Sequence, residues 1–437
     1  MIDRRTLIAA AAALSAAPVI ARSKSKAVSQ TFPAGFLWGA STAGHQIEGN
    51  NSNSDTWFLE NMKPTVFAEP SRDAANSFHL WPQDMDLAKE LGLNAYRFSI
   101  EWARIEPVEG LFSSAMLEHY KRMIEGARSR GLRPIVTMSH FTTPRWFAAK
   151  GGWTNTGSPA LFARYCDKAM RYLGDGIDHV ITFNEPNIMR ILDAIGLPPK
   201  VWEIQKAMLA EAGRQTGSKK FAALNAANIE DIEPMQLVLM EAHKAGKAAI
   251  KAVRSDVPVG VSLAMFDDQA VGKNSIRDAM RQKLYGWWLD VAKNDDFLGV
   301  QNYERTVWDD KGKVPPPPGG DRGHMGAEVY PPSLAGAVRY AHAATGVPIL
   351  VSEHGVGTDN DEVRARFIPA ALVELKKAID DGVPVKGYCH WSLIDNFEWI
   401  FGYKIHFGLH SVDRDTFART AKSSAAAYSS IVKKNAI

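Results

Sequence analysis

Two glutamates, each placed directly after a run of apolar and β-branched residues, have the clearest potential for chemistry. Residues 179–187 read H-V-I-T-F-N-E-P-N, so Glu185 follows a predicted buried strand. Glu353 follows the run V-P-I-L-V-S in the same way. A carboxylate buried among apolar groups costs several kcal/mol unless it is paired or protonated, so both positions favour a cleft over a core.

The segment around Glu185 has a second interpretation, as the start of a helix. Asn184 would then be the N-cap, and Glu185 and Pro186 would fill the first turn. The matching position of Glu353 favours a paired site instead. Two carboxylates are the minimum apparatus for cleaving a glycosidic bond.

Buried strands alternate with amphipathic helices about eight times along the chain. The strands are predicted at Phe36–Ala40, Ala95–Ile100, Arg133–Ser139, Val180–Phe183, Val259–Ala264, Phe297–Tyr303, Val347–Ser352 and Val385–Trp391. The helices are predicted at Asp84–Leu91, Met116–Arg130, Phe162–Leu173, Leu237–Val253, Met280–Val291, Leu334–Ala344 and Arg364–Asp380. This pattern predicts an α/β fold, a single (β/α)₈ TIM barrel with long loops at the C-terminal face of its strands. A doubly wound open sheet would have a similar alternation of strands and helices in its sequence. Residues 191 to about 232 mix helix-like segments with Gly-containing breaks, and we interpret them as a long loop insertion on that face.

Composition excludes several classes of function. The chain has 437 residues, 46% hydrophobic and 23% charged, with a net charge of +3, which gives no argument for nucleic acid or an anionic membrane as a partner. Cys166 and Cys389 are the two cysteines, and we expect both to be free thiols. His140 lies at a strand end without a second histidine at metal-binding spacing, so we interpret it as a substrate contact, reject zinc there, and predict neither metal nor cofactor.

The first residues are predicted to be an export signal. Arg4-Arg5 precedes the apolar stretch Leu7–Ile20, which is shorter than the ~20 residues of a membrane span. We therefore divide the chain into a twin-arginine-like leader (1–21), a polar spacer (22–31) and one catalytic barrel (32–437), and we expect a periplasmic protein that is not bound to the membrane after cleavage.

Three further segments carry side chains suited to sugars. Gln46 alternates with Ile47 in a stretch read as extended, and its amide is suited to a bidentate grip on hydroxyls. Arg97 on the second strand is interpreted as facing inward near the two glutamates. Residues 390–408 combine aromatics with Glu398. Because tryptophan faces stack on sugar rings and carboxylates accept hydroxyl hydrogen bonds, this segment suits a pyranose platform, although each aromatic taken singly reads as core.

These segments resemble glycoside hydrolase family 1, the retaining β-glucosidase-like barrels. The resemblance runs from about Phe32 to the C-terminus and rests on five motifs in the family's order: F-L-W-G-A-S-T-A-G-H-Q-I-E-G, Y-R-F-S-I-E-W, T-F-N-E-P, S-E-H-G and W-S-L-I-D-N-F-E-W. It implies that Glu185 is the general acid/base and Glu353 the nucleophile, supported by Arg97 and Tyr303. The residues that would bind the glycone by the same resemblance are Gln46, His140, Asn184, Trp391, Glu398, Trp399 and Phe407.

The chain departs from the family pattern at several positions. His354 replaces the usual Asn after the nucleophile, Phe141 replaces a Trp, and Gln301 and Asn302 replace an Asn and a Tyr before Tyr303. Residues 187–198 do not resemble the Gly-Tyr-rich loop that borders the family's leaving-group site. The preference for the leaving group is therefore not implied by the resemblance.

The leading functional hypothesis is a retaining exo-β-glycosidase, most simply a β-glucosidase, acting on a small-molecule β-glycoside or oligosaccharide. Double displacement requires carboxyl groups ~5–5.5 Å apart, with Glu185 initially protonated. A transglycosylase and a β-galactosidase or β-fucosidase on the same site remain alternatives, as does a 6-phospho-β-glycosidase, although Glu398 would repel a phosphate. A catalytically silent sugar-binding protein is the alternative from another class. The sequence does not specify the oligomeric state.

Overall fold

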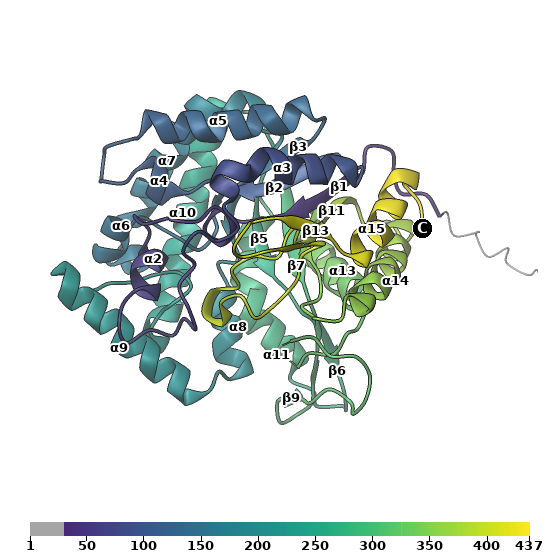
Figure 1. Cartoon of the computed structure of the whole chain (residues 1–437). Coiled ribbons are helices and arrows are strands. Elements are labelled where there is room, and N and C mark those ends of the chain that lie inside the picture. The colour runs from purple at the N-terminus through teal and green to yellow at the C-terminus, as the bar shows by residue number, and fades with distance from the viewer. Residues whose placement is uncertain (1–29, 325) are drawn as a thin grey trace, which may run out of the picture.

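The protein forms a closed barrel of eight parallel strands surrounded by helices (Figure 1). This computed structural model describes residues 30–324 and 326–437, so the predicted leader and nearly all of the spacer lie outside the described residues. The barrel strands are β1 (Leu37–Ser41), β2 (Ala95–Ser99), β3 (Arg133–Ser139), β4 (His179–Asn184), β5 (Val259–Ala264), β7 (Phe297–Asn302), β10 (Ile349–His354) and β11 (Val385–Trp391). Pairing of β1 with both β2 and β11 closes the barrel. This confirms the prediction of a TIM barrel and excludes the alternative of a doubly wound open sheet.

Most of the predicted helices are present, with starts up to seven residues earlier than expected. They are α3 (Ser77–Glu90), α5 (Ser114–Ser129), α7 (Ser158–Leu173), α10 (Ile232–Val253), α13 (Ser333–Thr345) and α14 (Asp361–Asp380). The predicted helix at 280–291 is instead α11 (Arg277–Arg281), a π-helical turn and α12 (Trp287–Ala292). A C-terminal helix, α15 (Ser423–Lys434), packs on α14 and closes the shell beside β1 (Figure 1).

Two local predictions were wrong. Residues 191–232 are largely helical, with α8 (Ile188–Ile195) and α9 (Pro199–Thr216) joined by a short turn. The glycines read as loop breaks, Gly196 and Gly217, have positive φ and end these helices as C-caps. The segment around Gln46 is the short helix α1 (Gly44–Ile47) rather than extended chain, and every residue of it is buried.

The barrel interior is apolar at one end and polar at the other. Its base is filled by one buried side chain from most strands, a separate cluster of Leu37, Ala95, Ile135, Ile181, Phe297, Leu350 and Cys389. Residues two or four positions further along a strand point to the same side of it. Arg97 on β2, Trp391 on β11 and Gln301 on β7 therefore point into the barrel above this base. The base therefore supports a polar layer at the C-terminal mouth, where TIM barrels carry their sites.

Two small sheets are added to the barrel. A three-stranded sheet of β6 (Asp267–Ala270), β8 (Arg305–Trp308) and β9 (Lys313–Val314) projects from the lower side of the barrel in Figure 1. The strands β12 (His410–Val412) and β13 (Arg419–Ala421) form a hairpin. Both cysteines are buried free thiols, as expected. None of the helices within the described residues is long and apolar enough to cross a membrane.

Candidate active site

Glu353 sits at the end of β10 and is held by three donors. Arg97 Nη1 donates to Oε1 in a close ion pair, Gln301 Nε2 donates to the same oxygen at 2.9 Å, and Tyr303 Oη donates to Oε2 at 2.7 Å. Burial raises the pKa of Glu353, but the charge of Arg97 and the Tyr303 hydroxyl oppose that rise. Glu353 is therefore the carboxyl group of this site that ionises more readily.

Glu185 lies one residue beyond β4 in an unusual backbone conformation. Its φ is +42°, and its N–H donates to Ser262 O at 2.8 Å. Among residues 30–324 and 326–437, no Arg, Tyr or Gln donates a hydrogen bond to the Glu185 side chain as such residues do to Glu353. Burial, and then the negative charge of Glu353, raise the pKa of Glu185 well above its usual range, and Arg97 only partly opposes them. The arrangement favours a protonated Glu185 beside an ionised Glu353.

Irregularities in the strand register place these groups. The pairing of β10 with β7 shifts between Val351 and Glu353, and the pairing of β4 with β5 shifts between Ile181 and Asn184. Such bulges re-aim side chains next to active sites. Positive φ also occurs at Phe141 and Trp399 of the same mouth, and strain of this kind costs about 1–3 kcal/mol per residue.

Asn184 is oriented by the same groups that hold Glu353. Its Oδ1 accepts from Arg97 Nη2 and from Gln301 Nε2, both at 2.6 Å. With the carbonyl oxygen thus occupied, the amide nitrogen is the part of Asn184 that can donate to a substrate hydroxyl.

His140, Trp391 and Trp399 form an aromatic wall at the barrel mouth. The ring of His140 stacks on Trp391 at 5.8 Å and on Trp399 at 6.2 Å between centroids. Burial and the charge of Arg97 lower the pKa of His140 well below its usual value, so its imidazole is neutral. Its Nδ1 is buried and has no hydrogen-bond partner within the described part of the chain. His140 can therefore exchange a hydrogen bond with a hydroxyl without adding charge.

Glu398 and Gln46 complete the polar end of this wall. Trp391 Nε1 donates to Glu398 Oε1 at 3.3 Å, and burial raises the pKa of Glu398 well above its usual range. Gln46 Nε2 donates to Asn396 Oδ1 at 2.9 Å and to Phe397 O at 2.8 Å, which uses both of its hydrogens. Its Oε1 is buried, and none of the residues that the structure describes forms a hydrogen bond with it. Gln46 is thus left as a single acceptor, not the bidentate grip that the sequence suggested.

Phe407 packs edge-on against Tyr303, with ring centroids 5.5 Å apart. Side-chain contacts join the predicted residues into two groups. One holds Glu353 with Arg97, Asn184, Tyr303 and Phe407, and the other holds His140, Trp391, Glu398 and Trp399. The charge of Arg97 acts on His140, and the charge of Glu353 acts on Glu185 and Glu398, so these groups lie near one another. Sequence reasoning missed two members, Gln301 and Asn396. Gln301 was noted only as a departure from the family, yet its inward position on β7, four residues after Phe297, was a usable signal.

This geometry supports covalent displacement at a sugar carbon. An ionised carboxylate held by Arg97 and Tyr303 is suited to attack, and a protonated carboxyl is suited to donate to a leaving oxygen. The sequence profile of "Glycosyl hydrolase family 1" matches residues 28–297 and 289–437 of this chain. The chain belongs to glycosyl hydrolase family 1.

Known relatives of this family 1 chain are named for hydrolysis of β-glycosides. It is 31% identical to a "Beta-glucosidase" of Agrobacterium sp. (strain ATCC 21400), over 92% of this chain and 95% of that one. It is 26% identical to a "Beta-galactosidase" of Pyrococcus woesei, over 93% and 98%. The solved structure of the β-glycosidase BGL167 superposes with a TM-score of 0.88 at 43% identity and covers 93% of this chain and 98% of its own. The protein is accordingly a retaining O-glycosyl hydrolase of the β-glucosidase type.

Proposed function

We propose that this protein is an exo-β-glycosidase that releases a terminal non-reducing β-D-glucosyl residue by double displacement. Glu353 attacks the anomeric carbon while Glu185 protonates the leaving oxygen. Glu185 then deprotonates the water that releases the sugar with its original configuration. The observation that carries the proposal is the unequal environment of the two carboxyl groups, since only Glu353 is held by Arg97, Gln301 and Tyr303.

The charge state of the pair changes during this cycle. When Glu353 is esterified its negative charge disappears, and the main electrostatic cause of the raised Glu185 pKa disappears with it. Glu185 then becomes more acidic at the moment when it must accept a proton from water. One residue can in this way serve first as acid and then as base.

The polar end of the site supports an unphosphorylated glycone. Among the described residues, no lysine or arginine forms an ion pair with Glu398, which is hydrogen-bonded to the indole of Trp391 and interacts with the side chain of Asn396. A phosphate there would meet a carboxyl group without a compensating cation. Glucose, galactose and fucose remain alternatives at this site, and a transglycosylase would use the same two glutamates with another acceptor.

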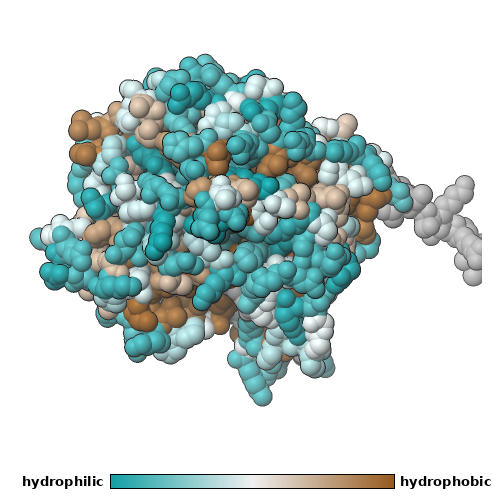
Figure 2. Space-filling view, viewed as in Figure 1, coloured by the Kyte–Doolittle hydropathy of each residue, from teal (hydrophilic) through white to brown (hydrophobic). Residues whose placement is uncertain are grey.

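Helix α8 follows directly after the proposed acid, so in this proposal it borders the leaving-group side of the site. Ile188 N donates to Glu185 O at 3.0 Å, so the helix starts one turn from the acid. Ile188, Leu192 and Ile195 follow at helical spacing and are only partly buried. Figure 2 shows apolar residues gathered on the visible face over the region where Figure 1 places α8 and α9. We therefore favour aryl or alkyl leaving groups over a second sugar.

A panel of aryl β-glycosides tests this function, with the anomer of the first product followed by NMR. We expect hydrolysis of the β-glucoside with the β anomer formed first, and a higher kcat/KM for octyl β-glucoside than for cellobiose. An α anomer as first product would exclude the mechanism. Absence of turnover on every common β-glycoside would favour a sugar-binding protein, and glycosylated acceptors would favour a transglycosylase.

We also propose, from Arg4-Arg5 and the apolar stretch that follows, that the protein is exported to the periplasm. N-terminal sequencing of the protein from a periplasmic extract is expected to start near Ala21. A chain that begins at Met1 would contradict cleavage.

A further inference from the structure

Two histidines and an aspartate from three separate loops meet beside the barrel mouth. His324 lies between β9 and α13, Asp359 between β10 and α14, and His406 between β11 and β12. His406 Nδ1 lies 2.7 Å from Asp359 Oδ1, and His324 Nε2 lies 3.3 Å from the same oxygen. One ligand atom from each residue lies within 4.8 Å of the other two. This cluster could not be predicted from a short sequence motif, because its three residues lie far apart in the chain and meet only in the folded barrel.

We propose that His324, Asp359 and His406 form a binding site for a divalent late transition metal such as Zn²⁺. Two imidazole nitrogens and one carboxylate oxygen are ligands that suit Zn²⁺, and the set is poor for Mg²⁺ or Ca²⁺, which prefer oxygen ligands alone. This inference does not depend on the glycosidase mechanism, since none of the three residues belongs to the catalytic constellation.

The spacing of the three atoms is close to that of a metal site. Ligand atoms at ~2.0–2.1 Å from a tetrahedral ion lie roughly 3.3–3.5 Å apart. In this cluster the distances between the ligand atoms of two residues run from 2.7 Å to at most 4.8 Å, a range that includes that value. Adjustments of about 1 Å by exposed side chains would therefore be sufficient. Three protein ligands would leave a fourth position for water.

The backbone around the cluster is fixed before any ion binds. Thr358 N donates to His406 O at 3.0 Å, and His324 N donates to Gly357 O at 2.9 Å, so each histidine is tied to the strand-end loop that carries Asp359. The guanidinium of Arg364, fully buried, donates to His406 O at 2.6 Å and to Thr358 O at 3.0 Å. Pre-organised loops lower the cost of assembling ligands.

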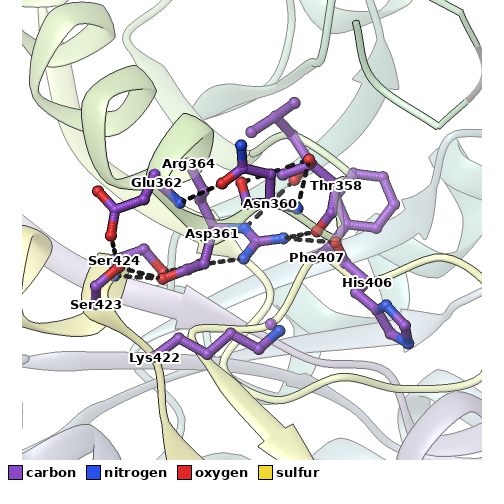
Figure 3. A network of polar contacts seen from close by, with 12 residues as sticks. Thr358, Asn360, Asp361, Glu362, Arg364, His406, Phe407, Lys422, Ser423 and Ser424 are labelled. Carbon is purple, nitrogen blue, oxygen red and sulfur yellow. Dashed lines mark hydrogen bonds and ion pairs between the residues drawn. The ribbon is translucent and has the colours of Figure 1, made fainter. Parts of the chain in front are cut away.

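The side chains themselves remain accessible. Figure 3 shows the imidazole of His406 turned away from the guanidinium of Arg364. Asp359 and His406 line an open cavity of about 370 Å³, and the side chain of Asp359 is 72% exposed. An ion therefore has a path from solvent to the cluster, and substitution of these side chains leaves the Arg364 network to backbone carbonyls intact.

The position of the site predicts what a bound ion would do. The ion would join three loops of the catalytic face, and His406 directly precedes Phe407, which packs on Tyr303. We infer that Zn²⁺ stabilises this side of the mouth. At a free concentration 100-fold above Kd, linkage in a chain of this size predicts a rise in Tm of about 3 °C.

Calorimetric titration of the full-length, EDTA-treated protein with ZnCl₂ tests the proposal. We expect one site with 1:1 stoichiometry, no comparable binding of MgCl₂, and a rise in Tm that saturates with the site. D359N and H324A are each expected to weaken Zn²⁺ binding by at least 10-fold and to abolish the Tm shift. H79A, which removes another exposed histidine, is the matched control and is expected to bind as wild type does.

Three results would overturn the proposal. They are absence of 1:1 Zn²⁺ binding in the wild type, wild-type affinity in both D359N and H324A, and equal binding of Mg²⁺. If one variant failed to fold, the Zn²⁺ affinity of the other variant and the absorption spectrum of the Co²⁺-loaded wild type would test the site. Tetrahedral coordination gives intense visible bands, and their absence would count against the site.

Discussion

Replacement of Glu353 by glutamine is expected to lower the pKa of Glu185, because that negative charge is the second cause of its raised value. At the ~5.5 Å separation that retention requires, and an effective dielectric constant of about 20, two carboxylates repel each other by about 3 kcal/mol. Removal of this repulsion is expected to bring the Glu185 pKa down toward its ordinary range. The charge of Arg97, no longer neutralised by Glu353, would act in the same direction.

The assay is a ¹³C NMR titration of protein labelled at the glutamate carboxyl carbon, since Glu353→Gln is expected to be inactive. A double variant that also carries Glu185→Gln assigns the resonance by its disappearance. Tyr303→Phe is the matched control. It removes a hydrogen bond to Glu353 but leaves the carboxylate charge in place, so the Glu185 pKa is expected to change much less than in Glu353→Gln. An unchanged or raised Glu185 pKa in Glu353→Gln would refute the reasoning and place the carboxyl groups too far apart for retention.

Further predictions concern activity and stability. Glu353→Ala is expected to lose turnover and to regain it with azide as an inverted glycosyl azide, detected by NMR; full activity without azide would remove the nucleophile assignment. Tyr303→Phe deletes a hydrogen bond to a charged group and is expected to lower kcat/KM by about 10–100-fold, whereas an unchanged value would show that Tyr303 does not support the nucleophile. The kcat/KM of the wild type should fall as pH rises through the raised pKa of Glu185, because the acid must be protonated, and an alkaline limb near the ordinary glutamate value would contradict this. Arg419→Met breaks a buried ion pair with Asp84 (2.8 Å) and is expected to reduce the free energy of unfolding by about 3–5 kcal/mol in urea titrations; a loss below 1 kcal/mol would show that Ser77 alone satisfies Asp84.

The barrel could be predicted from the sequence because its buried strands are short apolar runs separated by helical periodicity. Every barrel strand lies within two residues of its predicted bounds. The region after Ile191 was misread, because its glycines were taken for breaks in a loop when they cap the ends of α8 and α9. Glycine is common both in loops and just after the end of a helix, so the residue type alone does not distinguish the two.

The site was predicted as a set of residues, but not as a set of contacts. Glu185 and Glu353 could be recognised because charged groups at the ends of apolar strands need partners, and Arg97 because a charged group within such a strand needs one too. The use of both Gln46 hydrogens by Asn396 and Phe397 depends on loops joined only in the folded chain. Gln301 was counted as a deviation from a pattern, yet it bridges Asn184 and Glu353. Alternation along a strand predicts the side to which a residue points, but it does not predict which side chains that residue contacts.

The most direct test of the account is to trap the glycosyl-enzyme intermediate with a 2-deoxy-2-fluoro-β-glucoside that carries an activated leaving group. Mass spectrometry of the digested protein is predicted to find one added fluorosugar, on the peptide that contains Glu353. A label on Glu185, or inactivation without any covalent label, would contradict the assignment of nucleophile and acid.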